Sequence, residues 1–274
     1  MEMNGWIAQL AYLLALGLFA GATLHGAFLW RTGFDRDSDH PWWILLAGEV
    51  ALTGALWIHG WTEGHCPVGN IFEAAAFFAW ALGMIYLVTA RFFRIMPLVV
   101  GVAPILLGLT LFGMEAWIRP MKRTVGAAGL QNLHITLSIL AYGAFGIAAA
   151  AAVLYLLQSH ELRSDLCRAL RARLPSLSRL QRTCTISMTI GWILFTLGIG
   201  IGSLLAWTES CPLSLTDVKV LWSLAVWGGY GGLTLLAWRR QQFGHREMTG
   251  VLLAFLFVGM TFWWTSLLSP LHRP

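Results

Sequence analysis

Long apolar stretches alternate with short polar connections along the whole chain. The stretches have about 18 to 28 residues each, close to or above the roughly 20 that a helix needs to cross the hydrocarbon core of a bilayer. The pattern predicts an all-α polytopic membrane helical bundle with about eight transmembrane helices. We expect the spans at about 5–30, 42–61, 71–90, 95–113, 131–158, 184–207, 218–238 and 248–269.

The connections leave no room for a separate soluble domain, since the longest, 159–183, has only about 25 residues. We therefore expect one integral membrane domain over 1–274. The first stretch follows Met1–Gly5, which lacks the basic residues of a signal peptide, and it is too long for a signal-peptide core. An uncleaved first helix is expected.

Composition agrees with a membrane protein. Only 11% of the 274 residues are charged and 57% are apolar, whereas soluble domains have roughly 25% charged and 45–50% apolar residues. The net charge of +5 would suit nucleic acid binding if the basic residues shared one soluble face. They lie between the apolar stretches instead, so the lipid bilayer is an expected partner and nucleic acid is not.

The basic residues are concentrated in alternate connections. By the positive-inside rule, the connections richest in Lys and Arg lie in the cytoplasm. Both termini are then extracytoplasmic, together with the connections 62–70, 114–130 and 208–217. The basic residues of the predicted cytoplasmic connections are Arg31, Arg36, Arg91, Arg94, Arg163, Arg168, Arg171, Arg173, Arg179, Arg182, Arg239, Arg240 and Arg246.

Four histidines fall on the predicted outer side: His59, His65, His134 and His272. Two imidazoles from different helices at one membrane face can supply the axial nitrogens of a haem iron, and tryptophan rings such as those of Trp207 and Trp222 can cover the macrocycle. The alternative is structural, because Trp is common at membrane interfaces and a histidine at a helix end is often only a satisfied polar group.

Two further pairs of residues stand out. Cys66 and Cys211 both lie in predicted outer connections, where an oxidising compartment permits a disulfide between them. His25 and Glu49 are ionisable groups inside apolar stretches, at similar depth when counted from the cytoplasmic ends. Such groups usually face a partner or a cavity, so these two form either a polar site or a contact that holds the helices together.

No catalytic motif is evident. The Gly198-x-Gly200-x-Gly202 run lies inside an apolar stretch, where small residues favour close helix packing over dinucleotide binding. No residue is a persuasive nucleophile or general base, so we predict no catalytic residue of the chain's own.

Several motifs in order resemble CcsA/ResC-type cytochrome c assembly proteins. The segment from Gly64 to Glu73 resembles the family's G-H-F-P-L-S-D-L-Y-E, and Leu133 to Ser138 resembles its L-M-M-H-V-S. Leu197 to Gly202 resembles a glycine-containing run, Asp217 to Lys219 the start of the next helix, and Leu267 to His272 the closing L-L-x-x-G-L-H. The resemblance covers about 65–274.

The resemblance implies a protein that handles noncovalent haem b in cytochrome c biogenesis and presents it on the outer face of the cytoplasmic (inner) membrane. His134 and His272 match the two outer axial ligands, Asp217 matches the acid of a tryptophan-rich segment, and Trp207 and Trp222 fall in matching motifs. The implied partners are a ResB/CcsB-type membrane protein and apocytochrome c. Such a chain acts as a haem chaperone or a synthase component.

Departures from the family pattern leave other functions open. In 208–217 only the acid of the tryptophan-rich segment remains, as in the HemX and YpjD-like branches, and a histidine expected in the following span is missing. The residues proposed as secondary haem or polar sites are His25, His59, His65 and Glu49. The alternatives are an electron-transfer subunit with a permanent haem b, and a regulatory or scaffold homologue without haem.

Overall fold

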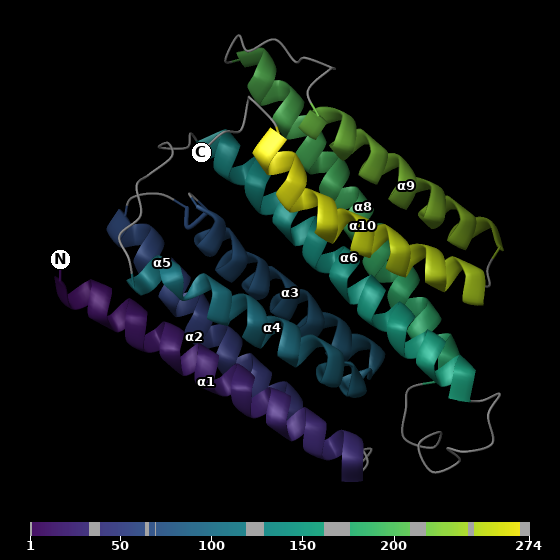
Figure 1. Ribbon diagram of the computed structural model, residues 1–274, viewed down its shortest axis with the longest axis horizontal. Coiled ribbons are helices and arrows are strands. Elements are labelled where there is room, and N and C mark those ends of the chain that lie inside the picture. The colour runs from purple at the N-terminus through teal and green to yellow at the C-terminus, as the bar shows by residue number, and fades with distance from the viewer. Residues whose placement is uncertain are drawn as a thin grey trace. The chain divides into compact units, whose positions relative to one another are not determined.

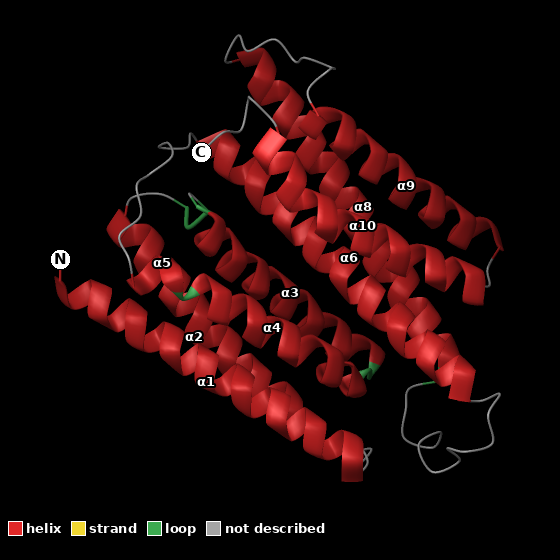
Figure 2. Ribbon diagram, in the orientation of Figure 1, coloured by secondary structure: helices red, strands yellow, loops and turns green. Residues whose placement is uncertain are grey.

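The computed structural model describes residues 2–32, 39–63, 66–68, 70–118, 129–161, 176–208, 218–240 and 244–268. All the regular secondary structure in these ranges is helical, and no strand occurs in them (Figures 1 and 2). The elements are α1 (Glu2–Thr32), α2 (His40–Glu63), α3 (Ile71–Phe93), the 3-10 helix η1 (Met96–Leu98), α4 (Val99–Gly113), α5 (Glu115–Ile118), α6 (Gly129–Glu161), α8 (Leu177–Thr208), α9 (Val218–Arg240) and α10 (His245–Leu268).

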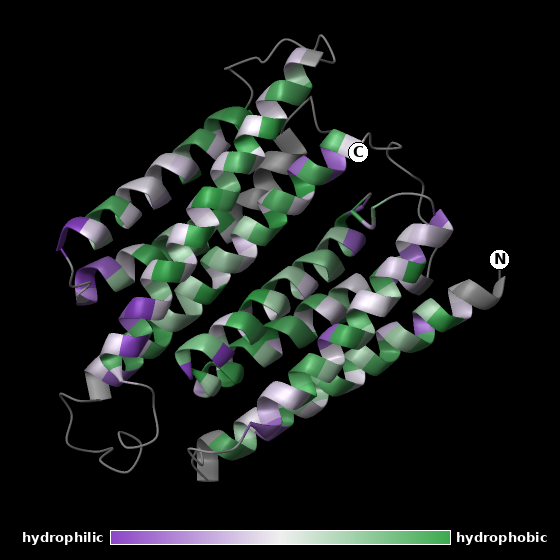
Figure 3. Ribbon diagram, turned by 180° about the vertical axis from the view of Figure 1, so that it is seen from behind, coloured by the Kyte–Doolittle hydropathy of each residue, from purple (hydrophilic) through white to green (hydrophobic). Residues whose placement is uncertain are grey.

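The predicted fold class is confirmed: the chain is a multi-pass helical membrane protein. Within the described residues, seven helical segments are long and apolar enough to cross a membrane. They lie in α1, α2 and α3, in Met96–Trp117, which contains α4, and in α6, α8 and α9. The 24-residue α10 occupies the position of the eighth predicted span. Figure 3 shows apolar residues along the helices, with hydrophilic residues more frequent toward their ends.

The chain divides into two compact units. The first contains residues 1–127 with 160–179, and the second contains 128–159 with 180–274. The single domain expected from the sequence stays a prediction.

In the first unit, α1 packs antiparallel to α4. Near one end, Tyr12 Oη donates a hydrogen bond to the Thr110 carbonyl at 2.6 Å. Near the other end, a Cβ added at Gly26 would lie 3.7 Å from Val100 Cα, so the two backbones approach closely there. These two contacts define the register of α1 against α4.

Indole hydrogen bonds align α2 with α3 in the same unit. Trp42 Nε1 donates to the Leu87 carbonyl at 3.0 Å, and Trp80 Nε1 donates to Thr53 Oγ1 at 2.9 Å. From the first contact to the second, the α2 residue number rises from 42 to 53 while the α3 residue number falls from 87 to 80, so the two helices are antiparallel. The register defined by these contacts decides which polar side chains meet.

The second unit is built around α6, whose middle turns are almost entirely buried. The Phe145 ring stacks on Tyr230 of α9 with centroids 3.6 Å apart, and it lies against Gly191 of α8, where an added Cβ would come within 2.6 Å of the ring. Trp192 Nε1 of α8 donates to the Trp227 carbonyl of α9 at 3.2 Å. Glycine and aromatic side chains thus bring three helices into contact.

Candidate functional site

His134 lies near the start of α6 and points toward α8. Its Nδ1 is 2.7 Å from the Gly198 carbonyl oxygen. A carbonyl oxygen only accepts hydrogen bonds, so Nδ1 must carry the proton. In a neutral imidazole Nε2 then has the free lone pair, and no hydrogen bond reaches Nε2 from any residue that the structure describes. Nε2 is therefore the ring nitrogen whose lone pair no hydrogen bond from the described residues occupies.

The glycines of α8 make room for this contact. A Cβ added at Gly202 would lie 2.8 Å from both Cε1 and Nδ1 of His134, and one at Gly198 would lie 3.1 Å from Ser138 Oγ. Gly200, between them, faces open space. Gly198 and Gly202, four residues apart on α8, thus face Ser138 and His134, four residues apart on α6, so these two glycines serve helix packing.

Trp192 lies against Gly231 and Thr196 bonds to Trp227, so α9 is antiparallel to α8. Trp222 of α9 then lies within about one turn of the level of Gly198. Its Nε1 is buried and has no hydrogen-bond partner among the described residues, while its ring lies 4.2 Å from that of Phe257. A buried indole N–H usually finds an acceptor. Trp207, the other tryptophan expected here, is 84% exposed at the end of α8.

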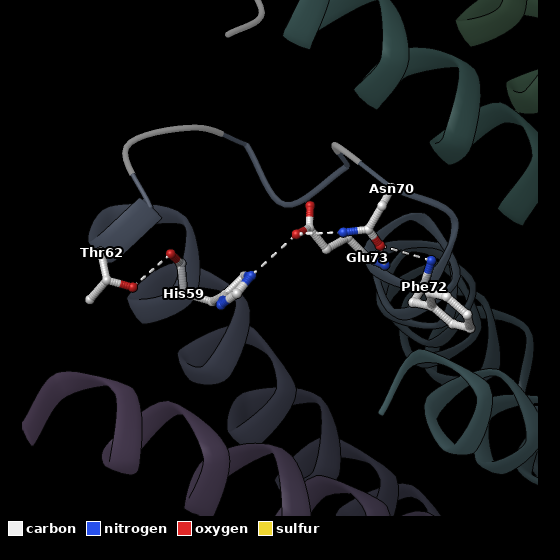
Figure 4. Close-up of polar contacts among 5 residues, drawn as sticks. All are labelled: His59, Thr62, Asn70, Phe72 and Glu73. Atoms are coloured by element: carbon white, nitrogen blue, oxygen red, sulfur yellow. Dashed lines mark hydrogen bonds and ion pairs between the residues drawn. The ribbon is translucent and has the colours of Figure 1, made fainter. Parts of the chain in front are cut away.

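A polar cluster lies at one end of the first unit, where α2 ends and α3 begins. In Figure 4, His59 points toward Glu73, with Nε2 3.4 Å from Oε1. Asn70 caps α3, because its Oδ1 accepts hydrogen bonds from the backbone N–H groups of Phe72 and Glu73 at 3.0 and 2.9 Å, while its Nδ2 donates to Glu73 Oε1. The cap of one helix thus positions the carboxylate that holds a histidine of another.

Aromatic rings cover the same cluster. The His59 ring lies 4.9 Å from that of Trp117, which stacks on Tyr12 at 4.0 Å. Gln9 Nε2 donates to the Trp117 carbonyl at 3.0 Å. Sequence reasoning singled out His59 but missed Trp117, Tyr12 and Glu73 as its neighbours. The one available signal was Asn70 three residues before Glu73, an arrangement typical of a helix start.

The expected pairing of His25 with Glu49 is wrong. Among the described residues, both oxygens of Glu49 and the Nε2 of His25 are buried without a hydrogen-bond partner. Gly48 lies against Phe19 of α1, so His25 is displaced from Glu49 by about seven residues, or roughly 10 Å along the helix axis. Glu49 is instead 1% exposed and packs against Gly83 of α3.

Four of the predicted site residues lie outside the described residues: His65, Cys211, Asp217 and His272. The ligand role of His272, the role of Asp217 and the Cys66–Cys211 disulfide therefore stay predictions. In the described part of the chain, no group of three or more His, Cys, Asp or Glu side chains could hold a metal ion by itself.

Fold and site together define a multi-pass membrane helical protein that holds an oriented imidazole near the end of one helix. Residues 68–272 match the model of the family described as cytochrome C assembly protein, and the chain belongs to that family.

The chain is similar to proteins named HemX and to proteins named CcsA. It is 29% identical over 189 residues to Protein HemX of Bacillus subtilis (strain 168), covering 67% of this chain and 68% of that protein. It is 25% identical over 250 residues to the cytochrome c biogenesis protein CcsA of Synechococcus sp. (strain CC9311), covering 78% of this chain and 82% of that protein. Protein HemX of Brevibacillus brevis is 30% identical over 166 residues, covering 59% of this chain and 60% of that protein.

Proposed function

We propose that the chain binds haem b noncovalently on the extracytoplasmic face of the cytoplasmic membrane and presents it for attachment to apocytochrome c. Membership of the cytochrome c assembly family supports a role in cytochrome c biogenesis. The observation that carries the haem proposal is the 2.7 Å hydrogen bond between His134 Nδ1 and the Gly198 carbonyl. Histidines that bind metals usually donate their second ring N–H in this way.

The described residues fit a haem. His134 would bind the iron through Nε2, and the buried Trp222 Nε1–H would donate to an acceptor such as a propionate oxygen. His272 would supply the second imidazole, with Trp207 and Asp217 near the outer face. Haem supplies the iron and the vinyl groups to which the apocytochrome's own thiols add. The chain's part is to hold the haem, fix its orientation and leave it accessible, together with a ResB/CcsB-type partner.

The first unit has a second histidine with an oriented ring. Glu73 accepts a hydrogen bond from His59 Nε2, which leaves Nδ1 as the nitrogen with the lone pair. Nδ1 lies next to the main chain, where a flat macrocycle has little room. We therefore keep His134 as the principal site and His59 as a secondary one, with His65 unassigned.

The visible absorption spectrum of the purified full-length protein tests the proposal. We expect a b-type spectrum, in the oxidised and the dithionite-reduced states, that is lost or greatly weakened in His134→Ala and His272→Ala. His245→Ala, an exposed histidine at the start of α10, is the matched control. Absence of a Soret band even after haem is added would refute the haem proposal and favour a regulatory or scaffold role.

Exchange of the bound haem separates the remaining alternatives. A haem chaperone should lose its haem to an excess of apomyoglobin, a soluble haem acceptor, within the time of a preparation. A b-type haem that stays bound through repeated additions of the acceptor would favour an electron-transfer subunit with a permanent cofactor.

A further inference from the structure

We infer that Gly202 is a positioning residue for the His134 imidazole, because the lack of a side chain there sets the rotation of the ring and hence the direction of Nε2. This inference rests on the proposed haem-binding function, which it deepens. It concerns a residue that touches neither iron nor porphyrin in the proposal and acts only through His134.

One edge of the ring faces two positions on α8, Gly198 and Gly202. The Gly198 carbonyl accepts from Nδ1 at 2.7 Å. Four residues further along, a Cβ added at Gly202 would lie 2.8 Å from both Nδ1 and Cε1 but 3.6 Å from Nε2. The Nδ1–Cε1 edge therefore lies against the α8 backbone, while Nε2 is turned away from it.

A methyl group at position 202 cannot fit while the ring keeps this rotation. Real Cβ atoms stay at least 3.0 Å from their neighbours, so the ring must turn about its Cβ–Cγ bond or the helices must separate. Either movement lengthens the 2.7 Å hydrogen bond to Gly198. The imidazole then loses the contact that fixes its tautomer, and its ligating nitrogen changes direction.

The chain provides two matched controls on the same helix. Gly200 faces open space, so alanine there adds a methyl group without any contact. A Cβ added at Gly191 would lie 2.6 Å from the Phe145 ring. This clash between α6 and α8 is at least as severe as the one at Gly202. Because Gly191 is about 16 Å along the helix from Gly202, it separates a general effect on helix packing from an effect on His134.

Titration of haem b into the full-length, detergent-purified protein tests the inference. We expect Gly202→Ala to lower the haem affinity at least about tenfold, as loss of a residue that orients a metal ligand does, and to shift the low-spin electron paramagnetic resonance signal of the ferric form. Gly191→Ala should lower the melting temperature with an unchanged signal, and Gly200→Ala should change neither. In the His134→Ala background, Gly202→Ala should have no further effect on affinity.

An unchanged signal and affinity in Gly202→Ala would overturn the inference, as would equal changes in Gly191→Ala. A wild-type protein that binds no haem would refute the proposed function, but not the inference about the ring. The inference would then be decided by nuclear magnetic resonance of ¹⁵N-labelled histidine. The wild type should show the Nδ1–H tautomer at His134 and Gly202→Ala a mixture, whereas identical tautomer populations would overturn it.

Discussion

Replacing Gly83 by alanine probes the packing around the buried carboxyl group of Glu49. The new Cβ would overlap Glu49 Oε1, and it would lie 2.5 Å from Cδ and 3.2 Å from Cγ. To restore the 3.0 Å that real Cβ atoms keep, Cδ must move by at least about 0.5 Å, and Oε1 by more, in a core where Glu49 is 1% exposed. Overpacking of this kind costs about 1–3 kcal/mol of unfolding free energy.

A double-mutant cycle isolates this contact. Unfolding followed by circular dichroism in mixed detergent micelles should show Gly83→Ala destabilised by about 1–3 kcal/mol. In the Glu49→Ala background the same substitution should cost much less, because the clashing group is gone. Gly101→Ala on α4, which meets no atom within 4 Å, is the control and should be neutral or slightly stabilising. An equal cost of Gly83→Ala in both backgrounds would refute the reasoning.

Two further predictions concern helix starts. Asn70→Ala removes the acceptor of two backbone N–H groups of α3 and should lower the unfolding free energy by about 1–2 kcal/mol. Asn70→Ser, which keeps a side-chain oxygen, should lose much less unfolding free energy. An equal loss in both variants would contradict the capping role. The Glu247 carboxylate accepts hydrogen bonds from the backbone N–H groups of Glu247 and Gly244 and lies beside Arg240. These contacts hold the pKa of Glu247 below its ordinary value. The native state therefore gains stability above the ordinary carboxyl pKa of 4.5 and loses it as the pH falls below that value. The melting temperature of Glu247→Gln should lack this acid-side loss, and a wild-type profile in the variant would be inconsistent with it.

The spans could be predicted from the sequence because each one is a long apolar run, but the helix ends could not. The predicted span at 131–158 is shorter than α6 (Gly129–Glu161), and the one at 184–207 is shorter than α8 (Leu177–Thr208). Both helices continue through polar residues that an apolar count leaves out. In the other direction, the run at 95–113 begins before α4, because Pro97 lies in a 3-10 turn that precedes the helix.

The candidate site was only partly predictable for a similar reason. His134 was found by its residue type and position, but its hydrogen-bond partner is the backbone carbonyl of Gly198, an atom that every residue possesses. Glu49 and His25 were matched by counting from the ends of apolar runs. The actual register of α1 and α2 depends on Gly48 fitting against Phe19, a contact between side-chain shapes that a hydropathy count does not contain.

The length of α6 has a consequence for the depth of His134 in the membrane. Its apolar part, Gly129–Ser159, has 31 residues and is about 46 Å long, against a hydrocarbon thickness of about 30 Å. Even at a tilt of 40° it spans about 35 Å, so the helix projects beyond the lipid tails. If the helix stands upright and the surplus is shared by the two ends, each projects about 8 Å. His134, five residues from the helix start, then lies level with the lipid headgroups, where a water-soluble polypeptide reaches it without entering the tails.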